Sequence, residues 1–516
     1  MAILIAGCKP EPVNTIDVIP CPLEVTAGIG TFDLNKRSVK FVTVDNLAEE
    51  EYEIVVTKHR AIVKTSSEQG RKLAKQTLRQ ITTEDGNGLK CCEIKDSPRF
   101  PYRGILIDCA RHFYPKEEIE KILDVMAYYR LNRMHWHLTD DHGWRIEIKQ
   151  YPLLTEVGAF GDIGSQPDWG EDPNLIGEVR LEGYYSQDDI REVVSYADSL
   201  GITIVPEIDM PGHMTSALAA YPYLGCTGGP YKVINFVGPR GKGFGKENLC
   251  IGKEEVFTFV ENVLKEVVEL FPSEYIHIGG DECIPERWNN CPNCQKRIQE
   301  EGIKGDEQFS EAKYLQNYFT QRVQKILEGY GRKIIGWDEI LDGKLGDGAT
   351  IMSWRGTRGG INAAKRGMDA IMSPSRNCYL DKRQSADDLH EPIAFGKRPL
   401  PVDSIYAYEP TAELSEEEAR HILGVQGNLW CDVISTSEYL EYMLLPRLAA
   451  LSEVQWCQME NRDWERFRKA LDSHVKFYED NGYVYAKHLW GIVGLPGHEY
   501  VIPATEAVQD TTSETK

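Results

Sequence analysis

The sequence predicts an α/β fold, a (β/α)8 TIM barrel preceded by a small α+β domain. From Gly104 onward, eight short apolar, β-rich runs alternate with helical repeats, and eight such units close into a barrel. A doubly wound open sheet is the competing topology. That sheet normally shows a GxGxxG fingerprint after its first strand, and the motif is absent here. The closed barrel is therefore favoured.

The first residues resemble the end of a bacterial lipoprotein signal. Residues 1–7 are apolar and directly precede Cys8, although the positive region and most of the apolar core of such a signal are missing. The alternative is an apolar N-terminus without a signal. We expect an exported protein, in the periplasm or on the outer membrane surface, held to the membrane only through a lipid on Cys8. Residues 9–20, polar and proline-bearing, are expected to form a tether.

The composition limits the possible partners. The 516 residues carry a net charge of −22, which argues against nucleic acid or an anionic membrane face, because both bind basic surfaces. Thirteen cysteines in so long a chain do not make a disulfide-dense scaffold. A neutral or cationic substrate fits this charge better.

Residues 21–100 read as the small α+β domain. Strand patterns at 38–45, 52–56, 61–65 and 89–95 accompany one helical run at 71–81. No catalytic constellation is visible in this part of the chain. The domain is therefore expected to be structural.

The barrel is predicted over residues 101–457. Its strands are expected at 104–109, 133–138, 202–208, 275–278, 333–337, 350–354, 369–372 and 424–430. Ser186 with Asp189 predicts a capped helix that stops at Gly201, and another helix is expected to start at Ser435. A C-terminal helical segment, 458–504, is expected to pack on the barrel before a disordered tail at 505–516.

Chemistry in such barrels takes place where strands end and loops begin. After the strand at 275–278, Gly279 and Gly280 lead into two adjacent carboxylates, Asp281 and Glu282. Other predicted strand ends add further carboxylates, one arginine and several tryptophans. Aromatic faces stack on the C–H surfaces of sugars, while carboxylates and arginine bind hydroxyls, so the rim predicts a sugar pocket.

Several separated motifs then agree in order with one family. They are DCARHF at 108–113, HWHLTDDHGWR at 135–145, PEIDMPGH at 206–213, HIGGDE at 277–282, GWDEI at 336–340, MSWRG at 352–356, CYLD at 378–381 and GVQGNLW at 424–430. With them the chain resembles the glycoside hydrolase family 20 β-N-acetylhexosaminidases over about residues 20–480. That family combines a small α+β domain with a (β/α)8 barrel.

The resemblance implies a retaining, substrate-assisted exo-hydrolase that removes terminal β-linked GlcNAc or GalNAc from glycans. Glu282 would be the general acid and base, and Asp281 would orient the 2-acetamido group. Tyr379 would donate a hydrogen bond to the acetamido oxygen as that oxygen attacks the anomeric carbon. Asp140 and His213 would form a relay to Glu282. No cofactor and no catalytic metal are expected.

The remaining implied roles concern sugar binding. Arg111 would hold the 3- and 4-hydroxyls, Asp381 a hydroxyl at the far end, and three tryptophans would enclose the acetamido methyl and the ring: Trp337, Trp354 and Trp430. The family commonly has Thr-Glu after the last tryptophan, whereas this chain has Cys431-Asp432. The shorter Asp432 leaves the sugar open between GlcNAc, GalNAc and a modified GlcNAc, for example 6-sulfated, or a disaccharide.

Other interpretations remain open at the level of sequence. Cys283, Cys291 and Cys294 include a Cys-x-x-Cys typical of zinc sites, but a second ligand pair at suitable spacing is missing. Local thiols or a loop disulfide are favoured, and Cys226 with Cys250 is another candidate pair. His135, His137 and His213 with nearby aspartates suggest a metal hydrolase as one alternative. A non-catalytic glycan-binding barrel is the other.

Overall fold

The computed structural model describes residues 12–160, 182–234, 246–343, 348–387, 389–396 and 398–502. Cys8 and the predicted tail at 505–516 lie outside the described residues, so the lipid anchor and the tail stay predictions. Within the described part of the chain, no helix is long and apolar enough to cross a membrane.

The N-terminal domain is a five-stranded sheet with one helix on it. The strand order is β1 (Glu24–Asp33), β5 (Gly88–Asp96), β3 (Tyr52–Val56), β4 (Ala61–Thr65) and β2 (Lys40–Thr43). Alternating burial along β3 and β4 gives the sheet one apolar face, on which α1 (Glu68–Gln80) packs. The strand β1 was not predicted, because most of its side chains are exposed and its first four residues show no alternation in burial.

The prediction of a loose tether before this domain is wrong for its last residues. Val18 and Ile19 are 1% and 0% exposed, and the Asp17 carbonyl lies 2.9 Å from His474 Nε2. Earlier in this segment, the Asn14 amide donates to the Gly28 carbonyl. The apolar side chains here are buried against both domains. The free energy gained by burying them fixes this segment in place, although its prolines are typical of a linker.

The predicted barrel is confirmed. Eight parallel strands are hydrogen-bonded in chain order, and the last one pairs with the first. They are β6 (Tyr102–Asp108), β7 (Arg133–His137), β10 (Thr203–Glu207), β11 (Tyr275–His277), β12 (Lys333–Trp337), β13 (Thr350–Ser353), β14 (Ala370–Met372) and β15 (Ile422–Leu429). Each overlaps its predicted range, because a strand buried on both faces is a continuous apolar run.

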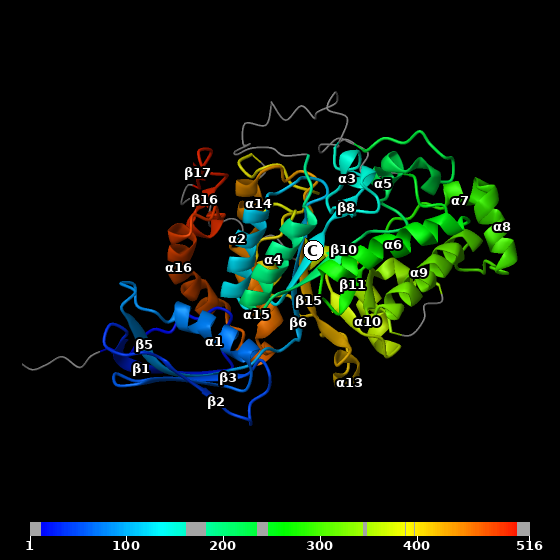
Figure 1. The fold of residues 1–516 in the computed structure, drawn as a ribbon. Coiled ribbons are helices and arrows are strands. Elements are labelled where there is room, and N and C mark those ends of the chain that lie inside the picture. The colour runs from blue at the N-terminus through cyan, green and yellow to red at the C-terminus, as the bar shows by residue number, and fades with distance from the viewer. Residues whose placement is uncertain are drawn as a thin grey trace, which may run out of the picture.

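Helices surround the barrel (Figure 1). The longer ones are α2 (Lys116–Tyr128), α4 (Gln187–Leu200), α6 (Glu254–Leu270), α8 (Pro292–Glu300), α9 (Glu311–Gly329), α10 (Arg358–Lys365), α14 (Ser437–Leu444), α15 (Arg447–Trp456) and α16 (Trp464–Asp480). The shorter ones are α3 (Leu153–Glu156), α5 (Thr215–Ala220), η3 (Pro222–Leu224), α7 (Glu286–Asn290), η4 (Asp338–Leu341), α11 (Ser375–Cys378), α12 (Val402–Tyr406), α13 (Glu416–Ala419), η5 (Met459–Asn461) and η6 (His488–Trp490). Two-residue strands pair as β8 (Thr139–Asp140) with β9 (Gly143–Trp144), and β16 (Ile492–Val493) with β17 (Tyr500–Val501).

Local capping explains several helix ends. Ser186 and Asp189 form the predicted capping box of α4, and Gly201 closes that helix at φ +84°. The helix expected from Ser435 has its N-cap one residue later, at Thr436, whose side chain accepts the Tyr439 amide, and α14 itself starts at Ser437. At Pro446 the chain starts a separate helix, α15, since proline has no amide to continue α14.

The small domain contacts the barrel at the start of the barrel strands, away from the strand ends that carry the predicted site. Arg103, in β6, pairs with Glu50 at 2.7 Å, and Arg130, before β7, pairs with Asp96 at 2.6 Å. Figure 1 shows α1 between the N-terminal sheet and the barrel helices. On α16, Phe477 stacks on Tyr128 with the ring centroids 3.7 Å apart.

Candidate active site

The predicted sugar-binding residues meet at one cavity of about 360 Å³ at the carboxyl ends of the barrel strands. Its lining consists of Arg111, Asp281, Glu282, Trp337, Trp354, Tyr379, Asp381, Phe395, Trp430 and Asp432. These residues follow or end six different strands, from β6 to β15. The other two predicted site residues lie behind the acidic pair, His213 next to it and Asp140 next to His213.

The turn after β11 brings the adjacent carboxylates into the cavity. Gly279 has φ +65°, and a Cβ at this position would lie 1.7 Å from Asp209 Oδ1. The same Asp209 oxygen accepts the Gly280 amide at 3.2 Å. Only glycine allows this close approach at position 279. At Gly280, with φ +96°, a Cβ would lie 2.7 Å from Ile340 Cγ2, so both glycines are needed where the strand turns into the acidic pair.

Glu282 and His213 share an unusual backbone. Their φ angles are +46° and +52°, in the left-handed region that non-glycine residues rarely adopt. Such strain costs about 1–3 kcal/mol per residue and persists where the surrounding structure enforces it. The Asp281 side chain is 12% exposed and that of Glu282 37%, so Asp281 lies deeper and Glu282 lies at the mouth.

His213 connects the acidic pair to a buried charge network. Its Nε2 lies 3.6 Å from Asp281 Oδ2 and 3.5 Å from Glu282 Oε2, and its Nδ1 lies 3.2 Å from Asp140 Oδ1. Burial lowers the pKa of His213, but Asp140 and Asp281 raise it more, and the pKa ends well above the ordinary value. His213 is therefore an imidazolium that can donate toward the carboxylates.

Asp140 is held as a carboxylate by its neighbours. Arg111 Nη2 lies 2.8 Å and His137 Nε2 3.0 Å from its Oδ2. Burial raises the pKa of Asp140, yet Arg111 and His213 outweigh that effect and keep it well below the usual range. Arg111 also pairs with Asp108 at 3.1 Å, and its guanidinium lies 5.1 Å from the ring centroid of Trp430. Two carboxylates thus fix the guanidinium at the wall of the cavity.

Four aromatic rings form an apolar box beside Asp281. The centroids of Trp337 and Trp430 are 5.7 Å apart, and Trp354 stacks with Tyr379 at 6.2 Å. The indole N–H of Trp337 donates to Glu207, and that of Trp354 donates to Glu339, each at 2.9 Å. Buried carboxylates thereby set the orientation of the box.

Two buried carboxylate oxygens in the cavity have no hydrogen-bond partner among the described residues, Asp281 Oδ1 and Asp381 Oδ1. Burial, with the nearby Glu207 and Glu282 charges, raises the pKa of Asp281. Burial and the charge of Asp432 raise the pKa of Asp381 to about 7. A buried acceptor without a donor costs free energy. A ligand with an N–H and hydroxyl groups would satisfy both oxygens.

Sequence reasoning gave no role to several residues that build the site. Glu207 accepts from Trp337 and pairs with three histidines: with His135 at 3.0 Å, with His277 at 2.9 Å, and with His137. This makes Glu207 a hub beneath the cavity. The PEIDMPGH motif placed it at a strand end, but nothing local shows which histidines it meets. Phe395, from an aperiodic loop after β14, carries no signal in the sequence.

Some of these groups lie close enough to share a cation, for example His137, Asp140 and Asp209. The histidines, however, already pair directly with carboxylates, and the His213 imidazolium next to the acidic pair would repel a metal ion. The arrangement suits proton transfer better than metal-assisted hydrolysis.

Comparison with known proteins identifies the family. Residues 100–459 match the model of the glycosyl hydrolase family 20 catalytic domain. A "Beta-hexosaminidase" of Porphyromonas gingivalis is 43% identical over 383 residues, covering 74% of this chain and 46% of the relative, so the chain spans about half of that protein. A "Beta-hexosaminidase" of Akkermansia muciniphila is 32% identical, covering 84% of this chain and 85% of the relative.

Solved structures agree with this result. A family 20 exo-β-N-acetylglucosaminidase of Vibrio harveyi, in complex with N-acetylglucosamine, superposes with a TM-score of 0.82 at 30% identity, over 93% of this chain and 80% of that one. A β-N-acetylhexosaminidase of Bacteroides fragilis gives 0.77 at 30%, over 91% and 96%. The chain therefore belongs to glycosyl hydrolase family 20 and carries the catalytic domain of a glycoside hydrolase.

Proposed function

We propose that this chain is an exo-β-N-acetylhexosaminidase that removes a terminal β-linked GlcNAc or GalNAc from glycans by a retaining, substrate-assisted mechanism. One observation carries the proposal: the unpartnered, buried Oδ1 of Asp281 lies beside an apolar box of Trp337, Trp354, Tyr379 and Trp430. An acetamido group needs such an environment, since its N–H requires an acceptor and its methyl requires apolar walls.

In the proposed first step, the acetamido oxygen of the substrate attacks its own anomeric carbon. Asp281 accepts the acetamido N–H and stabilises the positive charge that develops there, while the Tyr379 hydroxyl donates to the oxygen. Glu282, at the cavity mouth, gives its proton to the leaving glycosidic oxygen. An internal nucleophile held in place contributes about 7–11 kcal/mol through its effective molarity.

In the second step, Glu282 takes a proton from a water molecule whose oxygen attacks the anomeric carbon. The bond to the acetamido oxygen breaks, the oxazolinium-type intermediate opens, and the β-configuration is restored. The imidazolium of His213, 3.5 Å from Glu282 and fixed by Asp140, stabilises the carboxylate that Glu282 becomes between the two steps. This agrees with the names of the relatives and with the N-acetylglucosamine held by the Vibrio harveyi enzyme.

The far end of the cavity favours an uncharged sugar. Asp381 and Asp432 both line it, and the charge of Asp432 helps to raise the pKa of Asp381. A sulfate placed there would add a third negative group to a buried site, at a cost of several kcal/mol. We therefore propose plain GlcNAc or GalNAc as the terminal residue rather than a 6-sulfated form.

The test compares Glu282→Gln and Asp281→Asn with the unchanged chain. With an alkyl N-acetylglucosaminide, whose leaving group needs a proton, we expect Glu282→Gln to lose about 10²–10⁴-fold in kcat. With an aryl glycoside of low leaving-group pKa, the loss should be much smaller. Asp281→Asn should lose activity on both substrates, because the acetamide is needed whatever the leaving group.

Two controls separate the alternatives. A matched glucoside without the 2-acetamido group should be hydrolysed at a negligible rate, and the first-formed product should have the β-configuration. Equal rates on both sugars, or an inverted product, would refute substrate assistance. Binding of N-acetylglucosamine without any turnover would instead identify a glycan-binding barrel.

A further inference from the structure

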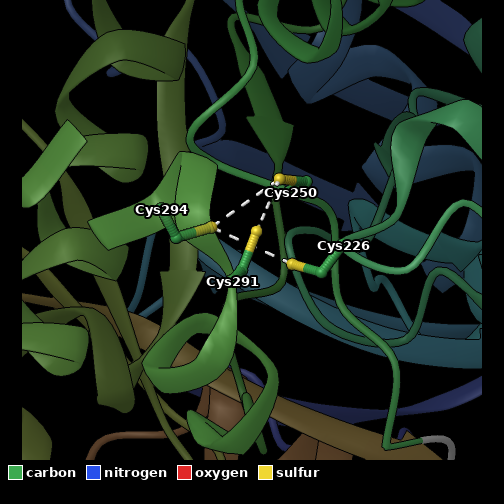
Figure 2. Close-up of side chains that lie close together, drawn as sticks. All are labelled: Cys226, Cys250, Cys291 and Cys294. Atoms are coloured by element: carbon green, nitrogen blue, oxygen red, sulfur yellow. Dashed lines mark hydrogen bonds between the residues drawn. The ribbon is translucent and has the colours of Figure 1, made fainter. Parts of the chain in front are cut away.

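Four cysteine side chains from three separate stretches of the chain converge next to the acidic loop. Cys226 follows η3, Cys250 precedes α6, and Cys291 and Cys294 belong to the start of α8. Their sulfurs all lie within 4.8 Å of one another (Figure 2). Three of the four residues are buried, and Cys226 is partly exposed. This cluster lies outside the sugar cavity and has no role in the proposed reaction.

We propose that Cys226, Cys250, Cys291 and Cys294 bind one structural zinc ion as a tetrathiolate. The separations are 3.9 Å between Cys226 and Cys294, 3.5 Å between Cys250 and Cys291, and 3.7 Å between Cys250 and Cys294. Zinc–sulfur bonds of about 2.3 Å in tetrahedral geometry place the sulfurs about 3.8 Å apart. The cluster therefore already has the dimensions of a zinc site.

Two disulfides would require a different arrangement. A disulfide joins one pair, whereas the Cys250 sulfur lies at nearly equal distances from Cys291 and Cys294. Paired bridges have no need for the mutual convergence of all four sulfurs, but a tetrahedral ion requires it. Here all four sulfurs meet at one point instead of forming two separate pairs.

The backbone supplies the two halves of the site by different means. The Cys-x-x-Cys of Cys291 and Cys294 spans the first turn of α8, with Cys291 as its N-cap. The other half comes from an antiparallel bridge between Gly225 and Leu249, the residues that directly precede Cys226 and Cys250. The second pair is therefore formed by cross-strand pairing, which explains why the sequence shows no second Cys-x-x-Cys.

Two further features suit a site that carries excess negative charge. The thiolates of Cys291 and Cys294 would lie at a helix N-terminus, where partial positive charge favours anions. Lys253 Nζ donates to the carbonyls of Tyr223 and Gly225, beside Cys226. A Cβ on Gly252 would lie 2.1 Å from the Asn293 carbonyl carbon, so glycine is required to press the two halves together.

The position of the site indicates its role. It joins the segment between β10 and α6 to the segment that begins with Asp281 and Glu282. Neighbouring bonds make the same connection: Trp288 Nε1 donates to Leu249 O at 2.9 Å, and Asn248 Nδ2 donates to Ile284 O at 2.6 Å. All four positions around the ion would be occupied by protein, as in structural rather than catalytic zinc sites.

The first experiment uses the full chain, produced with zinc in the medium and purified without chelator. Elemental analysis should find about one zinc per chain. A thiol reagent should reach these four cysteines after denaturation with a chelator but without any reductant. Zinc-free protein whose four thiols react only after reduction would show two disulfides and overturn the proposal. Zinc-free protein with four reactive thiols would overturn it as well.

The second experiment identifies the ligands. Cobalt(II) in place of zinc should show the visible bands of a tetrahedral thiolate site and sulfur-to-cobalt charge transfer. Cys250→Ser should lose most of that intensity and of the bound metal, whereas Cys92→Ala, a buried cysteine of the small domain, should keep both. An unchanged spectrum in Cys250→Ser would refute this ligand set. If that variant does not fold, the metal content and cobalt spectrum of the unchanged chain still decide the question.

Discussion

At the residue scale, the site depends on which buried groups carry charge. Arg111 and His213 keep Asp140 ionised, while burial pushes the pKa of Asp281 and Asp381 upward. Neighbouring carboxyl groups are thus held in different states by their surroundings, as acid–base catalysis requires. Asp381 is the clearest case, because its pKa of about 7 lies within the working range of an enzyme.

This pKa predicts a pH dependence of sugar binding. Above about pH 7 Asp381 is ionised and accepts a sugar hydroxyl; below it the group is protonated and that acceptor is weakened. KM should therefore fall as pH rises through 7. Asp381→Asn should raise KM about 10–100-fold, because the loss in binding free energy is that of one hydrogen bond to a charged group. The variant should also abolish this pH dependence.

Asp432→Asn is the matched variant for this prediction. Because the Asp432 charge helps to raise the pKa of Asp381, its removal should move the KM transition to lower pH. The measurement is KM against pH with one aryl substrate for all three proteins. A transition that stays in place in Asp381→Asn would show that another group titrates.

At the element scale, the turn after β11 carries the chemistry. Two glycines and the strained Glu282 let a three-residue strand end in two carboxylates that face one cavity. Besides their positive φ angles, Gly279 is required by the close approach of Asp209, and Gly280 by Ile340, whose Cγ2 would lie 2.7 Å from an added Cβ. The pocket therefore depends on packing between neighbouring strand ends.

Gly279→Ala tests that dependence. Its Cβ would collide with the Asp209 carboxylate at 1.7 Å, and the residue would keep a left-handed φ. We expect a loss of about 2 kcal/mol or more in the free energy of unfolding, together with a large loss in kcat as Asp281 and Glu282 are displaced.

Gly331→Ala is the control, since Gly331 has φ +70° with nothing within 4 Å of the added Cβ. It should cost only the backbone penalty of about 1–2 kcal/mol and leave kcat unchanged. Urea unfolding and steady-state kinetics measure both effects. Equal behaviour of the two variants would contradict the role given to Asp209.

At the scale of the whole molecule, a buried ion pair joins the small domain to the barrel. Arg130 and Asp96 are both 0% exposed at the side chain, and Arg130 also contacts Tyr52, Thr77 and the Pro20 carbonyl. The contact lies at the start of the barrel strands, away from the sugar cavity. Its role is thus to hold the domains together rather than to catalyse.

Arg130→Met should lower the free energy of unfolding by about 3–5 kcal/mol, because it leaves Asp96 buried without its charge partner. The double variant Asp96→Asn/Arg130→Met should recover part of the loss, since no unpaired charge remains. In the folded fraction, kcat should stay within about twofold. Urea unfolding of the unchanged chain, Arg130→Met, Asp96→Asn and the double variant measures the coupling. A double variant less stable than Arg130→Met would contradict this explanation.

The sequence alone determined the barrel, its strand ranges, and the side chains that end them. Apolar runs, capping residues and glycine turns determine secondary structure through neighbours a few residues apart, so the sequence alone predicts their effect. Only the tertiary structure decided what meets across long separations: Glu207 with its three histidines, Val18 and Ile19 buried between the domains, Phe395 at the cavity, and Cys226 and Cys250 opposite the Cys-x-x-Cys. These contacts arise from the closure of the barrel and the packing of its loops, and no local pattern records them.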